Sequence, residues 1–134
     1  MALKYFNYDE FDSPDEKGSF INMDRDFLLM LDEARGIAKT SFKINSGYRS
    51  ESHNKKVGGK SNSSHLVGKA VDIACNTSRE RFKILSALQE VGFNRFGIAD
   101  TFIHVDNDEK NPPLLYGHTS TAGNTLTYGK KEIQ

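Results

Sequence analysis

The sequence predicts an α+β domain in which helices cover one face of a small, mostly antiparallel sheet. Two segments repeat apolar residues at the helical spacing, and several short segments alternate apolar and polar residues as strands do. The 134 residues, of which 37% are hydrophobic, are enough for one domain with one core. We expect this domain to span residues 1–118 and a polar, flexible tail to follow over residues 119–134.

The first predicted element is an amphipathic helix over residues 24–38. Phe27, Leu31 and Ala34 share one face of this helix, and Asp24 suits the positive end of the helix dipole. The residues before this helix include several aromatic side chains, so we expect that segment to pack on the domain.

A short strand over residues 42–46 is predicted next, because its side chains alternate in polarity until Gly47. Ser50 is suited to cap a short helix that ends at residues 58–59, both glycines. Residues 60–68 are rich in serine and glycine and are predicted to form a loop.

The clearest strand is predicted over residues 69–75. Val71, Ile73 and Cys75 point to one side of this strand, and Asp72 points to the other.

A second helix is predicted over residues 78–91, because Thr77 and Glu80 form a capping box before it and Gly92 follows it. The remaining expectations are strands at residues 96–98 and 102–106, and an end to regular structure at Pro112 and Pro113.

The composition excludes several classes of protein. No apolar run approaches the roughly 18 residues that a membrane span needs. The net charge of zero offers no general attraction to nucleic acid. A single cysteine, Cys75, excludes an intramolecular disulfide framework and a metal site built from a cysteine cluster. We expect a monomer without a membrane span or a nucleic-acid partner.

Three ionisable side chains stand in unusual surroundings. His65 precedes a strand, His104 lies inside the apolar segment 102–106, and Asp72 is flanked by two alanines. A carboxylate on a buried face needs a hydrogen-bonding partner or a cation. Two imidazoles and one carboxylate form a catalytic zinc set, with a fourth position for water. The alternative is a His–Asp pair satisfied within the core and an unrelated surface histidine.

Four segments together resemble one protein family. Residues 63–72 are similar to the Ser-x-His-x-x-Gly-x-Ala-x-Asp signature of zinc D-alanyl-D-alanine carboxypeptidases. That family includes the L-alanyl-D-glutamate endopeptidases of phage lysis systems, and it shares its fold with the hedgehog signalling domain. Residues 46–50 (Ser-Gly-Tyr-Arg-Ser), 54–59 (Asn-Lys-Lys-Val-Gly-Gly) and 102–106 (Phe-Ile-His-Val-Asp) extend the resemblance to about residues 5–108.

The resemblance implies roles for individual residues. It implies that His65, Asp72 and His104 bind one zinc ion in a cleft on the face of the sheet away from the helices. It also implies that Arg49 grips a substrate carboxylate, for which a planar guanidinium is well shaped. Ser63 is expected near the metal, where it would hydrogen-bond the substrate or orient a metal ligand. Beside these residues, Tyr48 is expected to line the cleft or to fill the core.

The sequence departs from the family where the general base is usual. Many members place Glu or Asp three residues before the last zinc histidine, and others place a histidine two residues before it. Here these positions hold Thr101 and Phe102. Asp106 and Asp100 share the face of His104 if the strand is regular, so either is a candidate base or a partner of the zinc-bound imidazole.

These observations predict a zinc peptidase that cleaves an amide bond in peptidoglycan stem peptides. It would be a D,D-carboxypeptidase or an L-Ala-D-Glu endopeptidase, similar to a phage lysin. One zinc ion is the expected cofactor. The alternative is a zinc module that binds a cell-wall peptide or a protein without hydrolysing it. The N-terminus has no apolar stretch typical of a signal peptide, so we expect cytoplasmic synthesis and action at the cell wall or periplasm after export or release.

Overall fold

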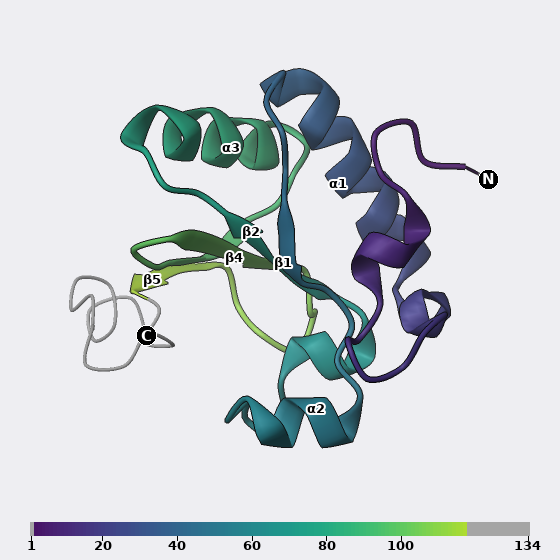
Figure 1. Cartoon of the computed structure of the whole chain (residues 1–134). Helices are drawn as coiled ribbons and strands as arrows, with labels where there is room; N and C mark the ends of the chain where they lie inside the picture. The colour runs from purple at the N-terminus through teal and green to yellow at the C-terminus, as the bar shows by residue number, and fades with distance from the viewer. Residues whose placement is uncertain (1, 118–134) are drawn as a thin grey trace.

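A five-stranded sheet with helices on both sides organises the chain, as seen in a computed structural model that describes residues 2–117. The strand order is β1-β2-β4-β3-β5. The long helices α1 and α3 lie side by side on one side of the sheet, and the short helix α2 lies on the other (Figure 1). The predicted α+β class is therefore confirmed, whereas the predicted tail from Thr119 lies outside the described residues.

The strands pair mostly in the antiparallel sense. Their bounds are Ile44–Ser46 (β1), Ala70–Ala74 (β2), Arg95–Ile98 (β3), Phe102–Asp106 (β4) and Leu114–Gly117 (β5). Only the pairing of β3 with β5 is parallel among the described strands. In the β2–β4 register Asp72 lies directly opposite His104, which places two of the predicted zinc ligands side by side.

Each of the three described α-helices begins after a capping residue, and the sequence predicts two of these caps, Ser50 and Thr77. Asp24 accepts a hydrogen bond from the amide of Phe27 at the start of α1, which covers Arg25–Ala38. Ser50 caps α2 (Glu51–Lys56), and Thr77 caps α3 (Ser78–Glu90). These side chains satisfy amide groups that the first turn of a helix leaves without partners, so they fix where each helix starts.

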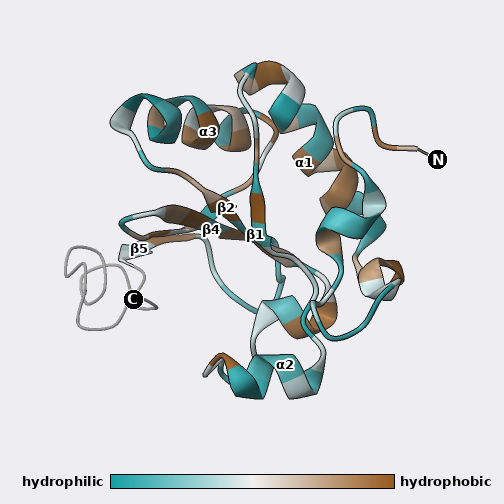
Figure 2. Ribbon diagram, viewed as in Figure 1, coloured by the Kyte–Doolittle hydropathy of each residue, from teal (hydrophilic) through white to brown (hydrophobic). Residues whose placement is uncertain are grey.

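The core fills the space between the sheet and the pair α1 and α3. Val71 and Ile73 of β2 project into it, and meet apolar side chains such as Leu31 of α1 and Leu88 of α3. Figure 2 shows hydrophobic residues gathered on the sides of α1, α3 and the sheet that face one another. Because strand side chains alternate, Asp72 emerges on the opposite face, as predicted.

The N-terminal segment is part of the domain. It forms two 3₁₀ turns, Tyr8–Phe11 and Ser19–Asn22, and it buries Phe6 and Phe11 against the core. The carbonyl of Phe11 accepts a hydrogen bond of 2.9 Å from the amide of Tyr48. The expectation that this aromatic segment packs is confirmed, and the segment supports the chain just after β1.

Two local expectations were wrong. Regular structure does not end at Pro112 and Pro113, because β5 follows them and pairs with β3. Proline lacks an amide hydrogen, but Leu114 has one and donates it to the carbonyl of Asn94 at 3.0 Å. In the predicted loop 60–68, Ser64–Val67 forms a 3₁₀ helix. Among the described helices, none has the length and apolar character to cross a membrane.

Candidate metal centre

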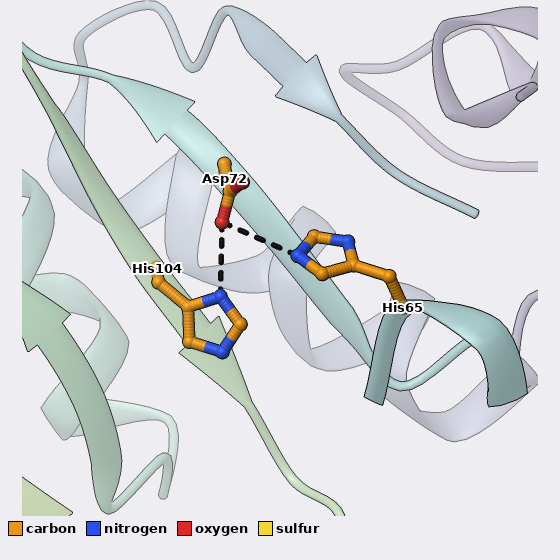
Figure 3. A group of neighbouring side chains, drawn as sticks. All are labelled: His65, Asp72 and His104. Carbon is orange, nitrogen blue, oxygen red and sulfur yellow. Dashed lines mark hydrogen bonds and ion pairs between the residues drawn. The ribbon is translucent and has the colours of Figure 1, made fainter. Parts of the chain in front are cut away.

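The structure brings His65, Asp72 and His104 together on the face of the sheet away from the core (Figure 3). One ligand atom from each residue lies within 4.8 Å of the others, and all three residues are buried. His65 comes from the 3₁₀ helix Ser64–Val67, Asp72 from β2 and His104 from β4. Two adjacent strands and one short helix therefore hold the group.

The position of His65 depends on a close approach between two turns. Its Nδ1 lies 2.8 Å from the carbonyl oxygen of Gly47, the residue that follows β1. Gly47 itself packs on the 3₁₀ turn Tyr8–Phe11, where an added Cβ would lie 2.8 Å from the Cα of Phe11. Ser63 caps the short helix, because its hydroxyl accepts a hydrogen bond of 3.2 Å from the amide of His65.

The remaining nitrogen of His65 is matched to a cation. With Nδ1–H donated to Gly47, a neutral imidazole presents only a lone pair at Nε2. This buried atom has no hydrogen-bond partner among the described residues, and it faces Oδ1 of Asp72 at 3.4 Å. Since an imidazole lone pair and a carboxylate repel each other, a cation between them satisfies both.

His104 lies between two carboxylates. Its Nδ1 is 2.9 Å from Oδ1 of Asp72, and its Nε2 is 2.8 Å from Oδ2 of Asp106. Burial alone would lower the pKa of His104, but the hydrogen bonds to Asp106 and Asp72 outweigh burial and raise the pKa to about 9. Burial would raise the pKa of Asp72, yet its interactions with the imidazoles of His65 and His104 outweigh burial and hold the pKa well below its usual range.

The spacing of Asp72 from each histidine suits a zinc ion. Zinc–nitrogen and zinc–oxygen bonds of about 2.0–2.1 Å place neighbouring ligand atoms roughly 3.3 Å apart. Oδ1 of Asp72 lies 3.4 Å from Nε2 of His65 and 2.9 Å from Nδ1 of His104, which brackets that spacing. If Nδ1 of His104 bound the metal, its Nε2–H would donate to Asp106, an arrangement that commonly orients metal-binding histidines.

A cleft of about 580 Å³ opens beside these ligands. It is lined by residues from the loop after α2, from the β3–β4 pair and from β5, and they include Arg49, Gly59, Lys60, Ser63, His65, Arg95, His104, Asp106, Leu114 and Tyr116. Two guanidinium groups and one ammonium group make this lining predominantly cationic. The cleft therefore suits a ligand that carries a carboxylate.

Arg49 is held at the edge of the metal centre by three partners. Its Nε donates to the hydroxyl of Ser46 at 3.1 Å, and one terminal nitrogen donates to the side chain of Asn54 at 3.2 Å. Its other terminal nitrogen lies 3.4 Å from Oδ2 of Asp72. Burial lowers the pKa of Arg49 while Asp72 raises it, and a guanidinium stays charged at neutral pH.

The other predicted site residues fall in different places. Ser63 and Asp106 line the cleft with Arg49. Tyr48 is half-buried against the core and is not among the residues that line the cleft; burial, together with Glu16 and other nearby acids, raises its pKa. Asp100 is exposed in the turn between β3 and β4, before the regular strand begins at Phe102.

Three residues of the site did not emerge from the sequence as site residues. Asn54 orients Arg49, and its place at the start of the Asn-Lys-Lys-Val-Gly-Gly segment was the available signal. Arg95 lies 3.1 Å from Asp106 and covers the ring of Tyr116. Burial and the charge of Asp106 raise the pKa of Tyr116, while Arg95 lowers it. Nothing in the sequence pattern connects Arg95 or Tyr116 with the histidines.

Comparison with known families agrees with this geometry. The sequence profile described as Peptidase M15 matches residues 4–106, a span that contains all three ligands, Arg49 and Asp106. No curated protein matches the chain. M15 enzymes are metallopeptidases that usually use zinc, which accords with the donor set of two imidazoles and one carboxylate. The resemblance found in the sequence is confirmed, and the chain belongs to the peptidase M15 family.

Proposed function

We propose that this zinc peptidase hydrolyses an amide bond in peptidoglycan stem peptides. The observation that carries the proposal is the position of Arg49, whose guanidinium contacts Asp72 at the edge of the metal centre and also lines the cleft. A peptide carboxylate bound to Arg49 would lie close to the metal centre, because Arg49 contacts Asp72 at 3.4 Å. Stem peptides carry free carboxylates and D-residues, so they match the cationic lining.

Each residue of the site has a separate role in the proposed hydrolysis. Zinc, when bound, lowers the pKa of a water molecule and polarises the scissile carbonyl. Arg49 holds a substrate carboxylate and thereby sets which amide bond is presented. Asp106 orients His104 through the contact at Nε2, and Arg95 holds Asp106 in turn.

We assign proton acceptance to Asp106 as well. It is the only carboxylate that lines the cleft within the described part of the chain. Asp106 would accept the proton of the attacking water and return it to the leaving amine. Asp100, which lies in the turn before β4, is the less favoured candidate because this turn is outside the cleft lining.

Mass spectrometry of purified muropeptides incubated with the zinc-loaded protein tests the proposal. Loss of one terminal alanine would identify a D,D-carboxypeptidase, and a cut between L-alanine and D-glutamate would identify an endopeptidase with a lysin-like role at the cell wall or periplasm. His65→Ala is the matched control, since it removes one ligand on the short helix. Equal products from the wild type and His65→Ala would contradict metal-dependent hydrolysis.

One observation favours a second function. Asp106 already contacts both His104 and Arg95, and Thr101 occupies the position where many relatives carry the general base. A domain with these features could bind a cell-wall peptide or a protein partner without cleaving it. A zinc-loaded protein that binds muropeptides and releases no product over many hours would establish this binding function.

A further inference from the structure

A row of residues crosses the sheet through the metal centre. Asp72 of β2 pairs with His104 of β4, and His104 pairs with Gly97 of β3. Gly97 in turn pairs with Tyr116 of β5. Residues that are direct partners in neighbouring strands present their side chains on the same face. Tyr116 therefore belongs to the face that carries the zinc ligands.

The row contains a glycine between the histidine and the tyrosine. Gly97 has no side chain, so this position of the row contributes no side chain between Tyr116 and His104. The centroids of these two rings are 6.4 Å apart, and Tyr116 lines the same cleft as Arg49 and Ser63. Along the row, Tyr116 and Asp72 lie on opposite sides of His104. Tyr116 therefore lines the cleft from the side of His104 that faces away from Asp72.

Arg95 holds the ring in this position. Its guanidinium carbon lies 5.5 Å from the centroid of the Tyr116 ring, within the range of a cation–π contact. The same guanidinium is fixed by Asp106 at 3.1 Å and by the carbonyl of Pro112 at 3.1 Å. The ring is therefore placed by a side chain that is itself anchored at two points.

We propose that Tyr116 is a catalytic residue whose phenol donates a hydrogen bond to the carbonyl oxygen of the scissile amide. The inference rests on the proposed function. When the oxygen of water bonds to the carbonyl carbon, the electron pair of the C=O bond moves to the carbonyl oxygen, which becomes an oxyanion. The C–N bond then breaks, and the amine leaves with the proton that came from water. The phenol keeps its proton throughout and stabilises the oxyanion, as preorganised donors do in other hydrolases.

A purely structural role is the competing explanation. Tyr116 could serve only as a surface on which Arg95 rests, and thereby keep Asp106 in place. Tyr116→Phe distinguishes the two, because phenylalanine keeps the ring and loses only the hydroxyl group. A packing role predicts no change in this variant, whereas a hydrogen bond to the substrate oxygen is lost.

The test measures binding as well as turnover. The binding probe is a phosphinate analogue of D-alanyl-D-alanine, whose tetrahedral anion resembles the oxyanion, and its affinity for the zinc-loaded protein is measured by calorimetry. We expect Tyr116→Phe to bind this analogue about 10- to 100-fold more weakly and to lose about 10²-fold in kcat. Its KM and its affinity for zinc should stay at the wild-type values. Leu115→Ala is the control, because Leu115 is the neighbouring exposed residue of β5 and does not line the cleft.

The outcomes separate this inference from the proposed function. Wild-type binding of the phosphinate that falls in Tyr116→Phe supports the inference, even if no muropeptide is cleaved and the hydrolytic function fails. Equal phosphinate affinity in the wild type and Tyr116→Phe overturns it. If the wild type cleaves muropeptides without binding this phosphinate, an unchanged kcat in Tyr116→Phe overturns it. A parallel loss of zinc affinity in Tyr116→Phe would also overturn it, since that result indicates a structural role.

Discussion

Asp106 combines two tasks that substitutions can separate. Its Oδ2 faces Nε2 of His104, and the same carboxylate lines the cleft. In Asp106→Asn the amide oxygen can still accept from His104, but it cannot take up a proton. We expect kcat to fall by 10²- to 10⁴-fold, the usual contribution of a general base, with zinc affinity nearly unchanged. Steady-state kinetics and zinc titration would measure the two effects.

Asp106→Ala removes both tasks. The variant leaves Nε2 of His104 without its carboxylate, and the loss of such a partner typically lowers metal affinity 10- to 100-fold. Asp100→Ala is the comparison, because this carboxylate lies in the exposed turn before β4. Full activity in Asp106→Asn would show that Asp106 only orients His104. Full activity in both Asp106→Asn and Asp100→Ala would refute proton transfer by either carboxylate.

The protonation of His104 predicts how stability depends on pH once a chelator has removed the metal. The pKa of His104 is about 9 in the folded protein, above the ordinary value of 6.5. The protonated imidazole therefore stabilises the fold fully below pH 6.5, and this stabilisation is lost as the pH rises towards 9. We expect Tm to decline over this interval, as measured by thermal unfolding.

Two variants and the addition of zinc test whether His104 causes the decline in Tm. His104→Gln should remove the decline, and His53→Gln, which changes a residue of α2, should retain it. Saturating zinc should stabilise the protein more at pH 8.5 than at pH 6.5, because zinc competes with a proton for Nδ1 of His104. A Tm that is constant between pH 6.5 and 9 in the chelated wild type would contradict the assignment.

At the scale of elements, the turn after α2 controls the position of Arg49. A Cβ on Gly59 would lie 2.7 Å from Cγ of Asn54 and 3.0 Å from a terminal nitrogen of Arg49. Gly59→Ala therefore displaces the amide that orients the guanidinium. We expect KM to rise about tenfold, equivalent to about 1.4 kcal/mol of substrate binding, while zinc affinity stays constant. Steady-state kinetics on a purified stem peptide measures this change.

The adjacent glycine provides a matched control. Gly58 has a φ of +76°, and a Cβ there would meet no atom within 4 Å. Gly58→Ala should cost about 1–2 kcal/mol of stability through backbone strain and leave KM unchanged. If both alanine variants raise KM equally, the turn acts through its general conformation and the specific contact with Asn54 is unimportant.

The sequence predicted elements best where one local pattern determined them. Helices α2 and α3 begin directly after the expected caps Ser50 and Thr77, since a capping side chain acts on amides within its own first turn. Helix α1 begins within one residue of its expected start at Asp24. Strand β5 was missed, because its pairing with β3 depends on a distant edge and its sequence follows two prolines. The 3₁₀ helix at His65 was also missed, since its short hydrogen-bonded turn has no apolar periodicity.

The site residues, like the elements, were predictable where a local pattern marked them. Asp72 and His104 were predictable because strand alternation and flanking alanines mark a buried polar position, and family motifs identified His65 and Arg49. The contribution of Arg95 and Tyr116 was not predictable, because it arises from the lateral order of β4, β3 and β5. Lateral order is a property of the assembled sheet, and no local window of the sequence encodes it.

At the scale of the whole molecule, the sheet separates the core from the metal centre. The apolar cluster between the sheet, α1 and α3 contains none of the three proposed zinc ligands, which lie on the opposite face. Folding is therefore supported by a core that does not need the metal, unlike in small zinc fingers that unfold without it. We expect the chelated protein to keep its far-UV circular dichroism and a cooperative thermal transition.

Zinc should nevertheless stabilise the folded state, because the unfolded chain does not bring the three ligands together. At a free zinc concentration 1,000 times Kd, the added stability is about 4.1 kcal/mol, which corresponds to a rise in Tm on the order of 10 °C. His65→Ala should retain the fold and lose most of this rise, whereas Phe11→Ala should cost about 3–5 kcal/mol with or without zinc, because Phe11 is fully buried in the core. If chelation abolished the cooperative transition of the wild type, the core and the metal centre would form one folding unit. The stability of the core would then depend on the metal, although the sheet lies between them.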